Sequence, residues 1–299
     1  MLISGEVTKR LTRAAAMVSL VLLVPACTAF QTPEETRLLL IENEVPAIDD
    51  PVKCLMQLGG ERPVQKVGLN PDRIRVLSWN LEKGQHDDAL YQLGVLSSDA
   101  DIVSIQEAPL TEGIIDEFPN LPVWSFAPGY QSKDNLTGVM TLSRVAPLTH
   151  CVFTSQEPWL GTPKATSLIE FPIQGRSETV LSINLHAVNF TLTPKALDQQ
   201  LRAFESLIES HSGPVFLSGD FNTWSDARMA AVEQFAADNG LSILEFDYDR
   251  RTLVFDKVLD HVLVRGIEVV ESTSYEVDTS DHNALRVEMR LTELDEVSE

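Results

Sequence analysis

Polar side chains that bind metal ions or move protons recur where short apolar runs of the sequence stop. The runs are rich in β-branched residues, as strands are, and each leads into an Asn, Asp, Glu or His. Carboxylates and imidazoles gathered at one rim of a sheet suit a hard divalent cation and phosphate chemistry. The residues in these positions are Asn80, Glu107, His186, Asp220, Asn222, Asp260, Asp281 and His282.

Two of these positions have the chemistry of metal ligands or their neighbours. Glu107 ends the run from Asp101 to Gln106, where a carboxylate can bind a hard cation or, read alone, form a strand-end salt bridge. Asn80 follows Trp79, where its amide can hold a metal-bound water or simply shape a turn.

Asp220 and Asn222 lie two residues apart after a strand, so their side chains point the same way in extended backbone. The carboxylate can orient or deprotonate a water molecule, and the amide can donate to a phosphoryl oxygen. The alternative is an Asp-capped turn into the helix that the sequence predicts from Ser225.

The ordered set of motifs resembles the endonuclease/exonuclease/phosphatase superfamily, which has the DNase I-like fold. The resemblance runs from about Arg75 to Leu291 and rests above all on Gly219-Asp220-Phe221-Asn222 and Ser280-Asp281-His282. It implies that Glu107 is the main Mg²⁺ ligand, with Mn²⁺ as a possible substitute. It also implies that Asn80 is part of the metal and phosphate site and that Asp281 is a second metal ligand.

The same resemblance implies roles for the histidines. His186 matches the position at which DNase I, the sphingomyelinases and the inositol polyphosphate 5-phosphatases carry a phosphate-binding histidine. Asp260 and His282 form the expected dyad, in which a carboxylate fixes the imidazole tautomer and raises the basicity of its other nitrogen. Either Asp220 or His282 can be the general base.

These residues predict a Mg²⁺-dependent phosphoesterase that hydrolyses a small-molecule or lipid phosphoester by in-line attack of water. The alternatives are a secreted or periplasmic nuclease and a non-catalytic surface binding protein on the same fold. Lys164, Arg144 and Asn189 are further candidates for contacts in the pocket, although each can equally be a solvated surface residue.

Charge argues against nucleic acid as the substrate. The 299 residues carry a formal net charge of −21, with a sequence pI near 4.6, and no basic run follows residue 13. Because duplex DNA is held largely by Lys and Arg against its phosphates, tight duplex binding is not expected. A lipid headgroup remains a possible substrate.

The N-terminus has the pattern of an export signal, and residues 1–26 are predicted to be a lipoprotein-type signal peptide. Basic residues precede an apolar stretch from Ala14 to Ala26, which is shorter than the roughly 17–25 residues of a membrane-spanning helix. The segment from Leu23 to Cys27 resembles a bacterial lipobox and predicts a membrane anchor at a lipidated Cys27, in the outer membrane if the host is Gram-negative. An ordinary signal peptide cleaved near Ala26 and an uncleaved anchor are the alternatives.

The rest of the chain predicts one large domain. Residues 27–71 are predicted to be a tether and lead-in, with a short helix between Pro33 and Asn43. Residues 72–293 are predicted to form the domain, and residues 294–299 are predicted to be an acidic tail. Cys54 and Cys151 can pair or remain separate buried thiols. Strand patterns from Ile74 onward alternate with helix patterns at 87–96, 194–211 and 225–239, which predicts an α/β fold. The resemblance implies the same: a DNase I-like four-layer α/β sandwich, with two mixed β-sheets flanked by helices.

Overall fold

The computed structural model describes residues 38–40, 47–58, 60, 62–111, 114–132, 135–191 and 193–292. The predicted signal peptide, Cys27 and the acidic tail lie outside these residues. The helix predicted between Pro33 and Asn43 is wrong where the structure describes it, because Leu38–Leu40 is a short strand, β1. β1 pairs with β4 (Val123–Ser132) at the edge of a sheet.

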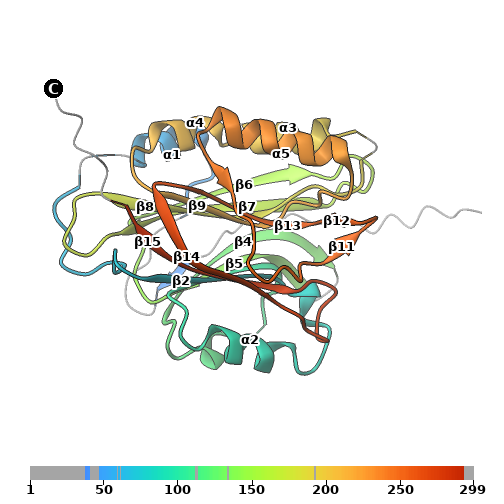
Figure 1. The fold of residues 1–299 in the computed structure, drawn as a ribbon, viewed down its shortest axis with the longest axis horizontal. Coiled ribbons are helices and arrows are strands. Elements are labelled where there is room, and N and C mark those ends of the chain that lie inside the picture. The colour runs from blue at the N-terminus through green and yellow to red at the C-terminus, as the bar shows by residue number, and fades with distance from the viewer. Residues whose placement is uncertain are drawn as a thin grey trace, which may run out of the picture.

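Two β-sheets face each other at the centre of the molecule (Figure 1). The seven-stranded sheet has the order β1, β4, β5 (Asn135–Ser143), β3 (Ile102–Pro109), β2 (Ile74–Asn80), β15 (Ala284–Leu291) and β14 (Ile267–Tyr275). The six-stranded sheet has the order β10 (Ser242–Ile243), β13 (Asp260–Arg265), β9 (Val215–Asp220), β8 (Thr179–His186), β7 (Pro163–Pro172) and β6 (Thr149–Gln156). Both sheets are mixed, since β2–β3 and β8–β9 are parallel pairs among antiparallel ones. A separate hairpin joins β11 (Leu253–Val254) to β12 (Lys257–Val258).

Helices cover the outer faces of both sheets. Figure 1 shows α1 (Pro51–Gln57), α3 (Lys195–Arg202), α4 (Glu205–Ser210) and α5 (Asp226–Asp238) over the six-stranded sheet, and α2 (Ala89–Ser97) under the other. Short 3₁₀ turns, η1 (Glu82–Gly84) and η2 (Ile114–Glu117), complete the set. The predicted four-layer sandwich is therefore confirmed. No helix in the described part of the chain is long and apolar enough to cross a membrane.

The three largest of four buried apolar clusters among the described residues hold the layers together. Residues such as Val76, Phe171 and Phe216 fill the space between the two sheets. A second cluster lies between the six-stranded sheet and its helices, and a third lies between α2 and the seven-stranded sheet. The rim that carries the predicted site residues therefore rests on two sheets with buried apolar contacts on both faces.

The helix predicted from Pro194 to His211 is two helices, α3 and α4. Phe204 interrupts it with φ −121° and ψ 9°, and its buried ring packs edge-on against Phe235 of α5, with 5.8 Å between the ring centroids. Burial of this ring in the apolar cluster accompanies the break in the helical backbone. Ser225 caps α5 by accepting from the Arg228 N–H, and Gly240, at φ +63°, follows its C-terminal end.

A disulfide joins Cys54 of α1 to Cys151 of β6, with 6.0 Å between the Cα atoms. Of the two alternatives for these cysteines, the structure therefore supports the pair. Farther along the chain, Gln65 and Leu69 form bridges to the segment after β7, at Gln174 and Ile173. Much of the predicted lead-in thus packs on the six-stranded sheet.

Candidate active site

Strand pairing brings predicted residues of the six-stranded sheet to one edge of the sandwich. His186 and Asp220 are register partners at the ends of the parallel strands β8 and β9. Asp260, at the start of the antiparallel strand β13, pairs with Asp220 from the other side. Because the carboxyl ends of parallel strands share an edge, these three residues meet there.

The seven-stranded sheet contributes the remaining residues at the same edge. Parallel pairing of β2 and β3 places Asn80 beside Gln106, one residue before Glu107. β15 runs antiparallel to β2, so the segment 280–282 that precedes β15 lies beside the end of β2. The Ser280 hydroxyl fixes this segment by donating to the Asn80 carbonyl at 2.7 Å.

Two backbone irregularities aim these side chains. Glu107 has a left-handed φ of +48° and lies in a bulge of β3, where the register against β5 shifts between Ile105 and Ala108. A bulge redirects the side chain of the strand. Gly219 has φ +146°, and a Cβ at this position would lie 1.9 Å from the Leu185 carbonyl oxygen. Only glycine therefore allows β9 to approach β8 closely enough to set Asp220 beside His186.

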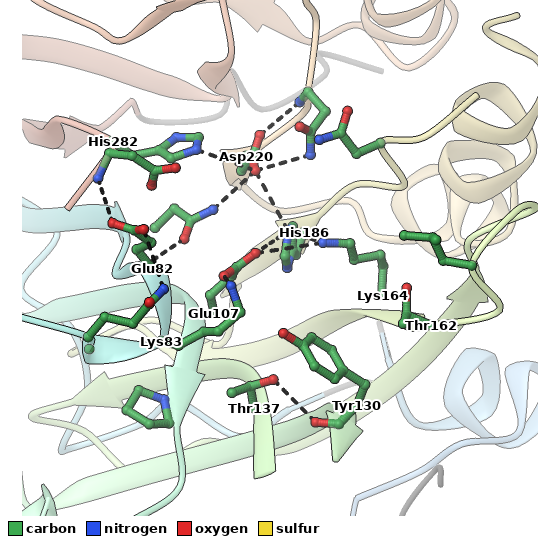
Figure 2. A pocket seen from close by; sticks show the side chains of 18 of the residues that line it. Glu82, Lys83, Glu107, Tyr130, Thr137, Thr162, Lys164, His186, Asp220 and His282 are labelled. Atoms are coloured by element: carbon green, nitrogen blue, oxygen red, sulfur yellow. Dashed lines mark hydrogen bonds and ion pairs between the residues drawn. The ribbon is translucent and has the colours of Figure 1, made fainter. Parts of the chain in front are cut away.

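A cavity of about 910 Å³ opens at this rim (Figure 2). All the predicted site residues line it except Asp260, which lies behind His282 and contacts it. The structure thus brings together the predicted residues from both sheets.

Asp220 is the centre of the polar contacts in this cavity. Its carboxylate accepts from the Asn80 amide at 3.1 Å, from the Asn222 backbone N–H at 2.8 Å and from the Asn222 amide at 3.1 Å. The Nε2 atoms of His186 and His282 lie 3.7 and 4.0 Å from its Oδ2. Burial raises the pKa of Asp220 to about 6, and the nearby Asp260 carboxylate adds to the rise.

The predicted dyad is formed. His282 Nδ1 lies 2.8 Å from Asp260 Oδ2, so Nε2 is the nitrogen that faces Asp220 and the cavity. Burial lowers the pKa of His282, but the Asp260 and Asp220 carboxylates outweigh it and raise the pKa to about 10. The Trp79 indole donates to the His282 carbonyl at 2.7 Å and holds the backbone of this residue in place.

Two lysines bring positive charge to the cavity from either side of Glu107 (Figure 2). Lys83 Nζ lies 2.6 Å from one Glu107 oxygen, and Lys164 Nζ lies 3.8 Å from the other. Lys164 is buried, which lowers its pKa, and its Nζ lies 2.7 Å from His186 Nε2. Burial also holds the pKa of His186 well below its usual value, and the Lys164 charge contributes. His186 is therefore a neutral imidazole that accepts from Lys164.

The predicted metal ligands fit a hard divalent cation. Glu107, Asn80 and Asp281 all offer oxygen atoms to the same cavity. The close approach of Lys83 shows that the Glu107 carboxylate already attracts a cation. Asp220, Asp260 and His282 form a second group, with one ligand atom of each within 4.8 Å of the others. Since Asp260 engages Nδ1 of His282, this group has the arrangement of a proton-transfer unit.

Of the three weaker candidates, Lys164 and Asn189 line the cavity, whereas Arg144 does not. Arg144 instead donates to the Ala100 carbonyl at 2.7 Å and lies 3.4 Å from Asp101.

Sequence reasoning missed other cavity residues, among them Glu82, Lys83, Tyr130 and Thr162. Glu82 and Lys83 closely follow Asn80 and adopt left-handed backbone at φ +48° and +63°. The sequence Glu82-Lys83-Gly84 directly after a site strand was the one signal that could have identified them.

Comparison with known proteins identifies the family. The sequence matches the Endonuclease/Exonuclease/phosphatase family over residues 77–282, a range that contains all the predicted site residues from Asn80 to His282. The chain belongs to this family. A UPF0294 protein of Vibrio cholerae serotype O1 is 32% identical to it over 265 residues, which cover 88% of this chain and 91% of the relative.

Solved structures share the family fold. An endonuclease/exonuclease/phosphatase from Beutenbergia cavernae superposes with a TM-score of 0.61 at 15% identity, covering 74% of this chain and 72% of the other. A mannosyl-6-phosphatase from Bacteroides thetaiotaomicron has a TM-score of 0.53 at 18% identity, covering 72% and 99%. Sphingomyelinase C from Streptomyces griseocarneus has a TM-score of 0.53 at 16% identity, also covering 72% and 99%. These likenesses establish the DNase I-like fold.

Proposed function

We propose that the protein is a Mg²⁺-dependent phosphoesterase that hydrolyses small-molecule or lipid phosphoesters by in-line attack of water. The convergence of Glu107, His186, Asp220 and His282 on one cavity carries this proposal. Family members are phosphoesterase hydrolases that generally depend on a divalent metal. Asp260 does not line the cavity and instead contacts His282 Nδ1, an arrangement that serves proton transfer rather than ligand binding alone.

The buried group of Asp220, Asp260 and His282 carries out proton transfer in this proposal. The Asn80 and Asn222 amides hold its carboxylate in one orientation, with the lone pairs aimed between the two imidazoles. We assign Asp220 as the general base that takes the proton of the attacking water. His282, fixed through Nδ1 by Asp260, presents Nε2 to the phosphoryl group as a donor.

The two lysines and His186 bind and neutralise the phosphate. Lys164 and Lys83 place two ammonium groups beside the catalytic carboxylates, and His186 is held between Lys164 and Asp220. Glu107, Asn80 and Asp281 would hold Mg²⁺ or Mn²⁺, which when bound supplies Lewis-acid polarisation of the phosphoryl oxygen. The lysines can orient the substrate phosphate toward that ion.

The distribution of charge supports a small or lipid substrate over duplex DNA. Among the Lys and Arg residues that the structure describes outside the cavity, ten lie within 4.0 Å of a carboxylate, so these side chains are already engaged. Affinity for duplex DNA depends on cations that release counterions from phosphates. Two of the structural neighbours are named as a sugar phosphatase and a sphingomyelinase, which supports phosphoesters of this size on this fold. The ten engaged cations are Arg62, Arg75, Arg144, Arg176, Arg202, Arg250, Arg251, Lys257, Arg286 and Arg290.

We also propose that the mature protein is anchored to the bacterial cell envelope through a lipidated Cys27. The lipobox-like sequence before this cysteine supports the proposal, and a disulfide-bonded domain is compatible with an oxidising compartment. Membrane fractionation of the native chain and of Cys27→Ser, with intact-mass analysis, tests it. Release of the variant is expected, and an unmodified N-terminus in the native protein would refute it.

Specific activity on a substrate panel tests the proposed reaction. Sphingomyelin, phosphoinositides, small diesters, monoesters and plasmid DNA are compared with Mg²⁺ at moderate salt, for the native protein and His282→Ala. We expect turnover of at least one small or lipid ester to exceed that of DNA and to be lost in the variant. Efficient plasmid nicking that His282→Ala abolishes would establish the nuclease alternative instead.

A further inference from the structure

A second, apolar groove opens directly beside the catalytic cavity. It has a volume of about 290 Å³, and none of the described residues that line it is ionisable. Asn189, Phe190 and Asn222 line both the groove and the cavity, so the two spaces adjoin. Since Asn222 also donates to Asp220 at 3.1 Å, one end of the groove lies next to the proposed base. The walls come from Trp159, Asn189, Phe190, Thr191, Asn222, Trp224, Val254, Phe255 and Leu259.

Large apolar side chains stand exposed at the mouth of this groove. Phe255, at the tip of the β11–β12 hairpin, is 80% exposed, Trp159 in the β6–β7 turn is 63% exposed, and Phe190 after β8 is 50% exposed. Three segments far apart in the sequence therefore present their apolar side chains around one opening. Exposed apolar groups concentrated around a functional cavity mark a binding surface more often than isolated ones do.

Buried polar contacts preorganise the groove. Glu157, almost fully buried, accepts from the backbone N–H groups of Asn189 and Phe190 at 2.6 and 3.0 Å. The Trp224 indole donates to the Asn189 side chain at 2.9 Å. The buried Arg228 lies 5.4 Å from the centre of the Trp224 ring and donates to the Thr191 hydroxyl at 3.0 Å. The walls are thus held in place by the protein itself.

We infer that this groove binds the acyl or alkyl chain of an amphiphilic phosphoester whose phosphate lies in the catalytic cavity. The inference rests on the proposed function and names its substrate class. A ligand that fills both spaces must join an anionic phosphate to an uncharged apolar group. A polynucleotide fits less well, because its next phosphate would meet no Lys or Arg among the groove residues.

Binding of alkyl phosphates of increasing length tests the inference. Methyl, butyl and octyl phosphate, each below its aggregation concentration, are titrated by calorimetry with Mg²⁺ into the full chain carrying Cys27→Ser, which avoids detergent. Each methylene that enters the groove should tighten binding about four-fold. With roughly four methylenes buried, octyl phosphate should bind about 250-fold more tightly than methyl phosphate.

Two variants locate the effect. Trp159→Ala combined with Phe255→Ala should reduce the ratio of octyl to methyl affinity about ten-fold or more, since each aromatic ring supplies much of the apolar wall. Both side chains are exposed, so their truncation should leave the unfolding midpoint unchanged. Tyr91→Ala, which removes an aromatic ring of 75% exposure from α2, is the matched control and should keep the ratio.

The outcomes separate this inference from the proposed function. The proposal that the groove binds the chain is refuted if methyl and octyl phosphate bind equally well, or if the effect of chain length survives in the double variant. Either result says nothing against hydrolysis of bis-p-nitrophenyl phosphate. Adenosine monophosphate that binds more tightly than octyl phosphate, and loses that advantage in the double variant, overturns it in favour of base stacking. Absence of hydrolysis refutes the phosphoesterase, whereas the calorimetry still reports on the groove.

Discussion

Removal of the disulfide should destabilise the domain without changing its active site. The bond joins Cys54 to Cys151 across 97 residues of sequence, so it closes a long loop in the unfolded chain. In the chain-entropy description, closing a loop of about 100 residues stabilises a protein by about 4.7 kcal/mol at 25 °C. The double variant Cys54→Ala/Cys151→Ala should therefore lose about 4 to 5 kcal/mol of unfolding free energy.

Urea unfolding of the native protein, with and without reductant, and of the double variant measures this loss. With a slope of about 2 to 3 kcal/mol per molar, the midpoint should fall by roughly 2 M urea. Both cysteines lie on the six-stranded sheet side, outside the residues that line the catalytic cavity. Turnover of bis-p-nitrophenyl phosphate below the transition should then remain within about two-fold of the native value, since a distant change leaves the site contacts intact.

Two results would refute this reasoning. Alkylation of the unreduced, unfolded native protein should add no mass at Cys54 or Cys151, and labelling of both would show that they are not paired. A midpoint that reductant and the double variant leave unchanged would show that the bond does not constrain the unfolded chain.

Three further substitutions test individual parts of the structure. Asp260→Asn should leave the fold unchanged and lower kcat by about 10³- to 10⁴-fold, by analogy with other carboxylate–histidine pairs, because the amide favours the wrong tautomer of His282. A kcat within ten-fold of the native value would show that the dyad has no part in the mechanism. Gly219→Ala should lower the unfolding free energy measured in urea by more than about 3 kcal/mol, because the added methyl group meets a backbone carbonyl. Gly161→Ala, whose methyl group would meet no described atom within 4 Å, should lower it by about 1 kcal/mol. Equal losses in the two variants would contradict the steric argument. Burial lowers the pKa of His150 to about 3 from a usual value near 6.5, so the stability that depends on its neutral form is complete above pH 6.5 and is lost as pH falls toward 3. Between pH 7 and 4.5, His150→Gln should therefore lose about 3 kcal/mol less unfolding free energy than the native protein. Identical profiles of stability against pH for the two proteins would contradict this prediction.

The rim of the site could be predicted from the sequence because its residues directly follow apolar strands. Asp220 and Asn222 are an example: a continuous apolar run precedes them and Gly219 permits the close approach, so local sequence determines where they lie. The alternation of strand and helix patterns predicted an α/β fold, and the family resemblance implied the four-layer sandwich. The pairing of Cys54 with Cys151 could not be decided, because spacing says nothing about distance in the fold.

Features that depend on tertiary contacts escaped prediction. Lys83 reaches Glu107 only because the loop after β2 turns through left-handed backbone. The break at Phe204 accompanies burial of its ring, against a helical pattern that continues through it. The apolar groove is lined by four segments that are distant in sequence, so no local sequence pattern could predict it.

The dependence of hydrolysis on metal and on Glu107 tests the central claim most directly. The native protein and Glu107→Gln, stripped with EDTA and confirmed free of metal, are assayed on bis-p-nitrophenyl phosphate while Mg²⁺ or Mn²⁺ is restored, and calorimetry follows ion binding in parallel. We predict no turnover in the stripped native protein, recovery with either ion, and loss of both ion binding and turnover in Glu107→Gln while its unfolding midpoint is retained. Full turnover by the stripped protein, or by Glu107→Gln, would contradict the assignment of this cavity as a metal-dependent phosphoesterase site.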